Sequence, residues 1–326
     1  MLKYILKRLG LCVLILLGVT LIIYFLVRCM PVDFVQNQIN AINATGSTAS
    51  EELVKAMYEE YGLGDNSIGG ILKGYFNWLK DTVTFDLGTS FISRRPVIDE
   101  IRSHMGVSFG VALAATILEF MIAIPLGITA ATHQYSIRDY VVTVFVMIGI
   151  SLPAFFFGRV IIMAGYSAFG LTPGPWDETL KGGAFLWSVV KQTMLPVITV
   201  TVLSIGGRMR MTRTNMLEVM NSDYIRTARA KGLGERKVIY KHAFRNTLIP
   251  LVTSLAGLLP TLFSGAMITE QVFDLPGIGK LALDSMTRAD IPFIMGYNTF
   301  LALLSVLGIL LADLMYAVVD PRVKLS

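Results

Sequence analysis

Charged residues and cysteines are scarce in this chain. Only 16% of its 326 residues are Asp, Glu, Lys or Arg, whereas about 25% are charged in an ordinary soluble domain. The two cysteines, Cys12 and Cys29, lie in one apolar run, roughly 25 Å apart if that run is a continuous helix. Such a separation excludes an intrachain disulfide. Neither the cysteines nor the three histidines have the spacing of metal ligands, so the sequence predicts no metal site.

Hydrophobic residues, in contrast, make up 54% of the chain, and its mean hydropathy is +0.62. Several apolar runs approach the roughly 20 residues that cross a bilayer as a helix. No small-residue cleavage site follows the first run, so we interpret it as a retained anchor helix and not as a signal peptide. The composition predicts an all-α membrane protein with six transmembrane helices, at residues 9–30, 105–131, 140–169, 194–207, 248–269 and 291–319.

The distribution of positive charge predicts the orientation of these helices. With the N-terminus inside, the cytoplasmic segments hold 16 of the 28 Lys and Arg residues, as the positive-inside rule requires. An even number of spans returns the C-terminus to the same side, so we expect both termini in the cytoplasm of a multi-pass protein of the plasma or inner membrane. The net charge of +5 therefore reflects membrane orientation, and no nucleic-acid partner is implied.

A basic segment at 222–246, between the fourth and fifth spans, is the most informative part of the chain. Its sequence from Asp223 to Pro250 is DYIRTARAKGLGERKVIYKHAFRNTLIP, which predicts two short helices joined at Gly232-Leu233-Gly234. Gly232 can adopt the left-handed conformation that ends a helix, and Glu235 places negative charge at the start of the next. Such a loop could merely fix topology and attract anionic lipid. Contact with lipid alone does not explain the glycine joint or the small residues Ala228 and Ala230.

This segment resembles the EAA loop of ABC importer permeases, in the form found in B-type subunits of the oligopeptide/dipeptide permease family. Arg226 and Thr227 depart from the general consensus, as does His242–Arg245, and these departures are typical of the peptide branch. Further similar stretches extend the resemblance over most of the chain: IPLGI at 124–128, SLPAFFFG at 151–158, LPVIT at 195–199, FDLPGIGKL at 273–281 and VDPR at 319–322.

The resemblance implies a type I ABC importer permease fold and a set of partners. The partners would be a second related permease, two cytoplasmic ATP-binding subunits and an extracytoplasmic substrate-binding protein, within membrane lipid. The chain itself would be no enzyme and would bind no cofactor, because ATP and Mg would be held by the partner subunits. The residues expected to couple it to the ATPases are Asp223, Tyr224, Arg226, Thr227, Ala228, Arg229, Ala230, Lys231, Gly232, Leu233, His242, Arg245 and Asn246.

The organisation expected from these patterns has three parts: an N-terminal transmembrane helix at 1–31, a sizeable extracytoplasmic loop at 32–104 and a five-helix permease core at 105–326. Within the loop, apolar residues at 71, 72, 75, 76 and 79 recur at helical spacing. By resemblance, this region would help to receive the binding protein. A purely structural cap over the spans is the alternative.

Two charged residues, Glu119 and Arg159, fall inside predicted spans. A charge at the bilayer centre costs at least about 2.5 kcal/mol, so each side chain should face a partner or a water-filled cavity. We expect these residues to line or gate the translocation path, and one arrangement is that they pair with each other. An ion pair that only fixes helix packing is the alternative.

Other functions are less well supported by the sequence. Gly106–Gly110 matches the Gly-x-Ser-x-Gly pattern of hydrolases, near His104, but an apolar helix is expected there in place of the strand-to-helix turn that this chemistry needs. Pro276–Lys280 lacks the first glycine and the Ser or Thr of a phosphate-binding loop. An ion-driven transporter should show internal repeats, which we do not detect. Peptides are the expected cargo, with glutathione, nickel complexes or opines as alternatives within the family.

Overall fold

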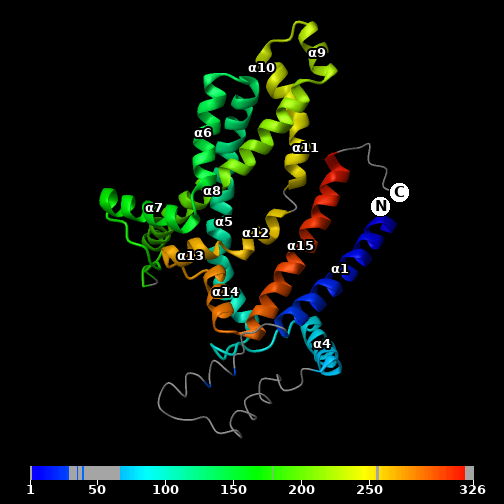
Figure 1. Ribbon diagram of the computed structural model, residues 1–326, viewed down its shortest axis with the longest axis vertical. Coiled ribbons are helices and arrows are strands. Elements are labelled where there is room, and N and C mark those ends of the chain that lie inside the picture. Colours follow the sequence, from blue (N-terminus) through cyan, green and yellow to red (C-terminus); the bar gives the residue numbers. More distant parts are fainter. Residues whose placement is uncertain are drawn as a thin grey trace. The chain divides into compact units, whose positions relative to one another are not determined.

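A computed structural model describes residues 2–28, 35, 39, 67–177, 179–254 and 257–319. Within these ranges the chain is helical, apart from loops and one isolated antiparallel bridge between Thr89 and Pro96, which confirms the all-α prediction (Figure 1). Cys29 and most of the predicted outer loop before residue 67 lie outside the described residues. The helices are α1 (Leu2–Arg28), α4 (Ile68–Val83), α5 (Val97–Thr132), α6 (Ile137–Ser151), α7 (Ala154–Phe169), α8 (Gly183–Met220), α9 (Asp223–Ala230), α10 (Glu235–Lys237), the π-helix η1 (Val238–Ala243), α11 (Phe244–Ser254), α12 (Leu258–Ser264), α13 (Met267–Phe273), α14 (Ile278–Thr287) and α15 (Ile291–Val319).

The chain divides into two compact units: residues 1–105 with 281–306, and residues 106–280 with 307–326. In the first unit, α4 packs against α1, and the helix expected from the apolar spacing at residues 71–79 is confirmed. The buried Tyr75 hydroxyl donates a hydrogen bond of 3.2 Å to the carbonyl of Leu17. Tyr75 also belongs to a cluster with Tyr24, Val27, Ile294 and Met295. The division into 1–31, 32–104 and 105–326 that the sequence suggested stays a prediction.

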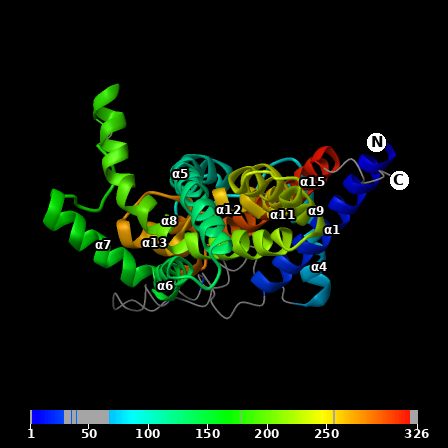
Figure 2. The ribbon, with the colours of Figure 1, turned by 90° about the horizontal axis from the view of Figure 1, so that it is seen from above.

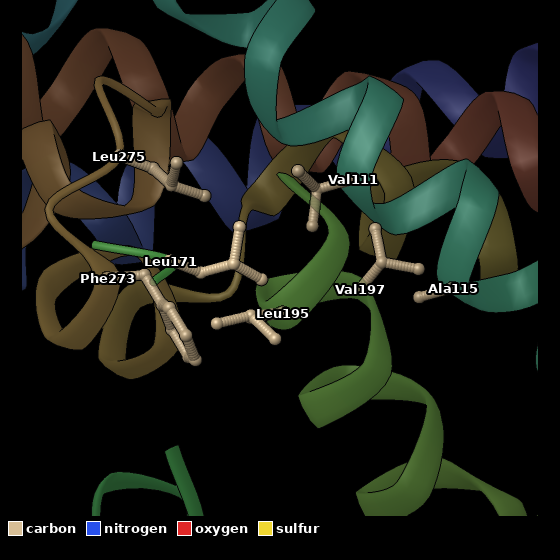
Figure 3. Close-up of a cluster of buried hydrophobic side chains, with 7 residues drawn as sticks. All are labelled: Val111, Ala115, Leu171, Leu195, Val197, Phe273 and Leu275. Carbon is tan, nitrogen blue, oxygen red and sulfur yellow. The ribbon is translucent and has the colours of Figure 1, made fainter. Parts of the chain in front are cut away.

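The second unit is a helical bundle whose core joins residues far apart in the sequence. Val111 and Ala115 of α5 lie near Leu195 and Val197 of α8 in one buried cluster (Figure 3). Leu171, Phe273 and Leu275 complete this cluster. α7 packs closely on α8 at Gly165, where a Cβ atom would lie 2.7 Å from Leu195 Cδ1 and would make that side chain move. Packing therefore holds α5, α7, α8 and α13 together.

The predicted third and fifth spans are wrong as continuous helices. The third is divided into α6 and α7, which meet at an angle of 103°, and α7 projects sideways from the rest of this unit (Figure 2). The break falls at Leu152-Pro153, where the proline holds Leu152 in an extended conformation with ψ 129°. The fifth is divided into α11, α12 and α13, with Gly265 at φ +71° between the last two.

The remaining predicted spans correspond to long helices. Among the described residues, four helices are long and apolar enough to cross a membrane, or five spans if the bent pair counts as one. The sixth predicted span coincides with α15. α5 and α8 continue beyond the predicted limits, since they are 36 and 38 residues long. The total of six transmembrane helices stays a prediction.

Candidate functional site

The basic segment at 222–246 forms the turn and helices that connect α8 to α11. Helix α9 ends at a turn in which the Gly232 N–H donates a 2.9 Å hydrogen bond to the Arg229 carbonyl. Gly232 has φ +73°, so the predicted left-handed joint is confirmed. The second helix is not a separate short element, because α10 runs through η1 directly into α11. One helical stretch therefore leads from Glu235 to Ser254.

The inner face of this segment is packed against the ends of α5 and α8. Ile225, Ala228 and Val238 share a buried cluster with Ile128 of α5 and Met216 of α8. Ala228 is only 7% exposed, because its small side chain allows α9 to approach its own chain. The segment is thereby fixed to two long helices. The part of Ala228 in ATPase coupling stays a prediction.

The outer face carries most of the residues that the resemblance assigned to ATPase coupling. Most of the basic side chains of the segment are exposed on its surface. Leu233 and His242 are half-buried. The exposed members are Asp223, Tyr224, Arg226, Thr227, Arg229, Ala230, Lys231, Gly232, Arg245 and Asn246.

One ion pair spans the glycine joint. Arg229 donates two hydrogen bonds to Glu235, from Nη2 to Oε1 at 2.7 Å and from Nε to Oε2 at 3.2 Å. Hydrogen bonding to the guanidinium holds the pKa of Glu235 below its usual range and raises the pKa of Arg229. The pair links α9 to α10 across the joint.

A cavity of about 490 Å³ lies within the second unit, between α5, α8 and the helices α11, α12 and α13. Small and polar side chains dominate its lining, and within the described ranges no aromatic side chain contributes to it. The polar lining residues are Ser108, Thr116, Glu119, Ser204, Arg208, Ser254, Thr261, Ser264 and Glu270.

Glu119 lines this cavity together with Arg208 of α8. Arg208 Nε donates a 3.0 Å hydrogen bond to Glu119 Oε1, and Nη1 donates one of 2.7 Å to Ser254 Oγ on α11. The guanidinium also lies 4.4 Å from the ring centroid of Phe120. The pairing of Glu119 with Arg159 considered from the sequence is therefore wrong. Arg159 is an exposed residue of α7 outside the cavity lining, and its place on a translocation path stays a prediction.

A second ion pair, between half-buried Arg213 and buried Asp139, joins α6 to α8. Arg213 binds the Asp139 carboxylate through both oxygens, with Nε to Oδ1 at 3.0 Å and Nη2 to Oδ2 at 2.9 Å. The Tyr135 backbone N–H also donates to Asp139 Oδ2, at 3.1 Å. Sequence reasoning identified no partner for Arg208 or Arg213. The apolar surroundings of Arg208 were the available indication that it needs one.

The Gly-x-Ser-x-Gly stretch lies in the interior of α5, helical on both sides, so it does not form the strand-to-helix turn of a hydrolase nucleophile. Ser108 instead donates a 2.6 Å hydrogen bond to Glu270 of α13 and accepts one of 2.9 Å from the Ile278 N–H. Glu270 is 1% exposed and also accepts hydrogen bonds from the N–H groups of Ala266 and Lys280. Sequence reasoning did not identify this carboxylate.

A bundle of long apolar helices, a cavity lined by small and polar side chains and a basic surface segment are the features expected of a membrane permease. The chain belongs to the family of binding-protein-dependent transport system inner membrane components, whose family model matches residues 123–325. It is a multi-pass membrane protein, and the family resemblance of its sequence motifs is confirmed.

Similar proteins match over their whole length. The oligopeptide transport system permease protein AppB of Bacillus subtilis is 36% identical over 325 residues, covering 99% of this chain and 100% of AppB. The dipeptide transport system permease protein DppB of Escherichia coli K12 is 32% identical over 345 residues, covering 99% of each chain. DppB of Alkalihalophilus pseudofirmus is also 32% identical, over 349 residues.

Proposed function

We propose that this chain is one of two permease subunits of an ATP-driven importer that carries peptides into the cell. The relatives that share its full length are named as oligopeptide and dipeptide permeases. The small side chains of the cavity suit this cargo, because they leave room for peptides that differ in their own side chains. An extracytoplasmic binding protein delivers the peptide.

One observation carries the mechanism: the basic segment is continuous with two helices that line the cavity. Arg208 lies twelve residues before the end of α8, about 18 Å along the helix. Ser254 ends the helical stretch that begins at Glu235. A displacement of the packed segment is therefore passed to both sides of the cavity as a rigid-body movement.

In this mechanism two cytoplasmic subunits bind ATP and Mg and dock on the exposed residues between Asp223 and Asn246. Their closure moves the segment, and the cavity switches between outward and inward openings. A second, related permease completes the path, with membrane lipid around the pair. Both termini lie in the cytoplasm, which places the basic segment on the side where ATP is present.

Purification of the tagged chain from its native membranes in mild detergent tests this proposal. Two ATP-binding subunits and a second permease should copurify, and the complex reconstituted in liposomes with its binding protein should take up peptide only with ATP. A chain that purifies alone and takes up peptide without ATP would refute the proposal.

A further inference from the structure

The two ion pairs of α8 differ in how completely their hydrogen-bonding groups are used. Arg213 engages both oxygens of Asp139. Arg208 engages a single oxygen of Glu119, and its second bond goes to Ser254. Among the residues that the structure describes, neither Glu119 Oε2 nor Arg208 Nη2 has a hydrogen-bond partner. Because Glu119 and Arg208 both line the cavity, these two unused groups are available to a ligand inside it.

The unused donor belongs to a guanidinium whose orientation is already fixed. Glu119 holds Nε, Ser254 holds Nη1, and the ring of Phe120 lies against the plane at 4.4 Å. With Nε and Nη1 engaged, Nη2 still has N–H groups to donate to an anionic oxygen, and charge-assisted hydrogen bonds are about twice as strong as neutral ones. Arg208 Nη2 is therefore placed to receive a carboxylate at this end of the cavity.

The other end of the cavity has the opposite character. Ser108 and Glu270 line it there, and Ser108 lies eleven residues before Glu119 on α5, about 16 Å along the helix. An extended peptide spans about 3.3–3.6 Å per residue, so about five residues reach from one end to the other. The Glu270 carboxylate favours a positive group at its own end, which orients a peptide with its carboxylate toward Arg208.

We infer that this cavity binds short peptides through their free terminal carboxylate, which Arg208 Nη2 receives while Glu119 Oε2 accepts a peptide N–H. The inference rests on the proposed function. It specifies that the permease itself recognises the carboxylate of the peptide. The peptide then moves with its carboxyl end leading, toward the end of α8 that joins the basic segment.

The test is uptake by the complete importer, with its binding protein, of trialanine and of trialanine amide. The binding protein is the same throughout, so its own preference cancels when the acid-to-amide uptake ratio is compared between variants. Arg208→Leu should lower this ratio about tenfold or more. Arg210→Leu is the matched control, because Arg210 lies on the same helix outside the cavity lining and should leave the ratio unchanged. An unchanged ratio in Arg208→Leu would overturn the inference.

Arg208→Lys covers the case in which the leucine variant fails to assemble. Lysine keeps the positive charge but lacks the planar fork, so the acid-to-amide ratio should still fall, and an unchanged ratio would overturn the inference. N-acetyl-trialanine, which lacks the free ammonium group, tests the opposite orientation of the peptide. If Glu119→Gln changes the ratio of trialanine uptake to N-acetyl-trialanine uptake, Glu119 binds the peptide ammonium at this end of the cavity and the inference is wrong. Failure of the proposed function looks different, because the wild-type importer would then take up none of these peptides with ATP.

Discussion

The hydroxyl of Ser108 on α5 donates a 2.6 Å hydrogen bond to the carboxylate of Glu270 on α13, across 162 residues of sequence. Both side chains are buried. Glu270 also accepts from the N–H groups of Ala266 and Lys280, while Ser108 accepts from that of Ile278. This network ties the segment from 265 to 280 to the wall of the cavity.

Ser108→Ala should therefore destabilise the protein. It removes one of the two hydrogen bonds to Glu270 Oε1 and leaves the Ile278 N–H without its partner, at a cost of about 1–3 kcal/mol. The thermal unfolding midpoint of the purified complex should fall. Gly106→Ala on the same helix is the control, since a Cβ atom there has no neighbour within 4 Å. Equal midpoints for both variants would show that the network contributes nothing.

Gly232→Pro should uncouple ATP hydrolysis from transport. Proline fixes φ near −65°, whereas Gly232 has φ +73°, so the joint between α9 and α10 must change its geometry. ATPase activity should persist in the reconstituted complex while uptake is lost. Gly234→Ala is the matched control, because Gly234 has φ −60° and no atom within 4 Å of an added Cβ. Normal uptake by the proline variant would argue against coupling through this joint.

Two neighbouring residues of α9 should behave in opposite ways. Tyr224 is 47% exposed and Ile225 is fully buried. Tyr224→Ala should weaken copurification of the ATP-binding subunits and leave the unfolding midpoint of the chain unchanged. Ile225→Ala should lower the stability by about 2–5 kcal/mol, because it opens a cavity in the cluster that fixes the segment. If Tyr224→Ala retains its partners fully, the docking surface must lie elsewhere.

The ion pairs Asp139–Arg213 and Arg229–Glu235 should contribute unequally to stability. The Asp139 side chain is 5% exposed, so Asp139→Asn should cost about 2 kcal/mol by weakening charged hydrogen bonds in a buried site. Glu235 is 55% exposed, and Glu235→Gln should cost less than about 1 kcal/mol. Thermal unfolding of the two variants measures the difference. A larger loss for Glu235→Gln would contradict this ranking.

The agreement between sequence and structure is greatest where local rules operate. Gly232 was predicted from its place after a basic helix, and only glycine adopts a positive φ without strain. The helix α4 and the bounds of α15 followed from apolar periodicity and run length. The break at Leu152-Pro153 was missed, because a continuous apolar run predicts one transmembrane span even where a proline interrupts the helix.

The sequence by itself determined that this chain is a helical membrane permease with a basic segment between its fourth and fifth apolar runs. Composition, run length and turn residues act over a few neighbours and need no knowledge of the fold. Only the tertiary structure decided that Glu119 pairs with Arg208 and not with Arg159, and that Ser108 donates a hydrogen bond to Glu270. These pairings depend on which helices pack together and on how each helix is rotated about its axis. The paired residues are separated by 89 and 162 positions in the sequence, so local sequence patterns cannot identify them.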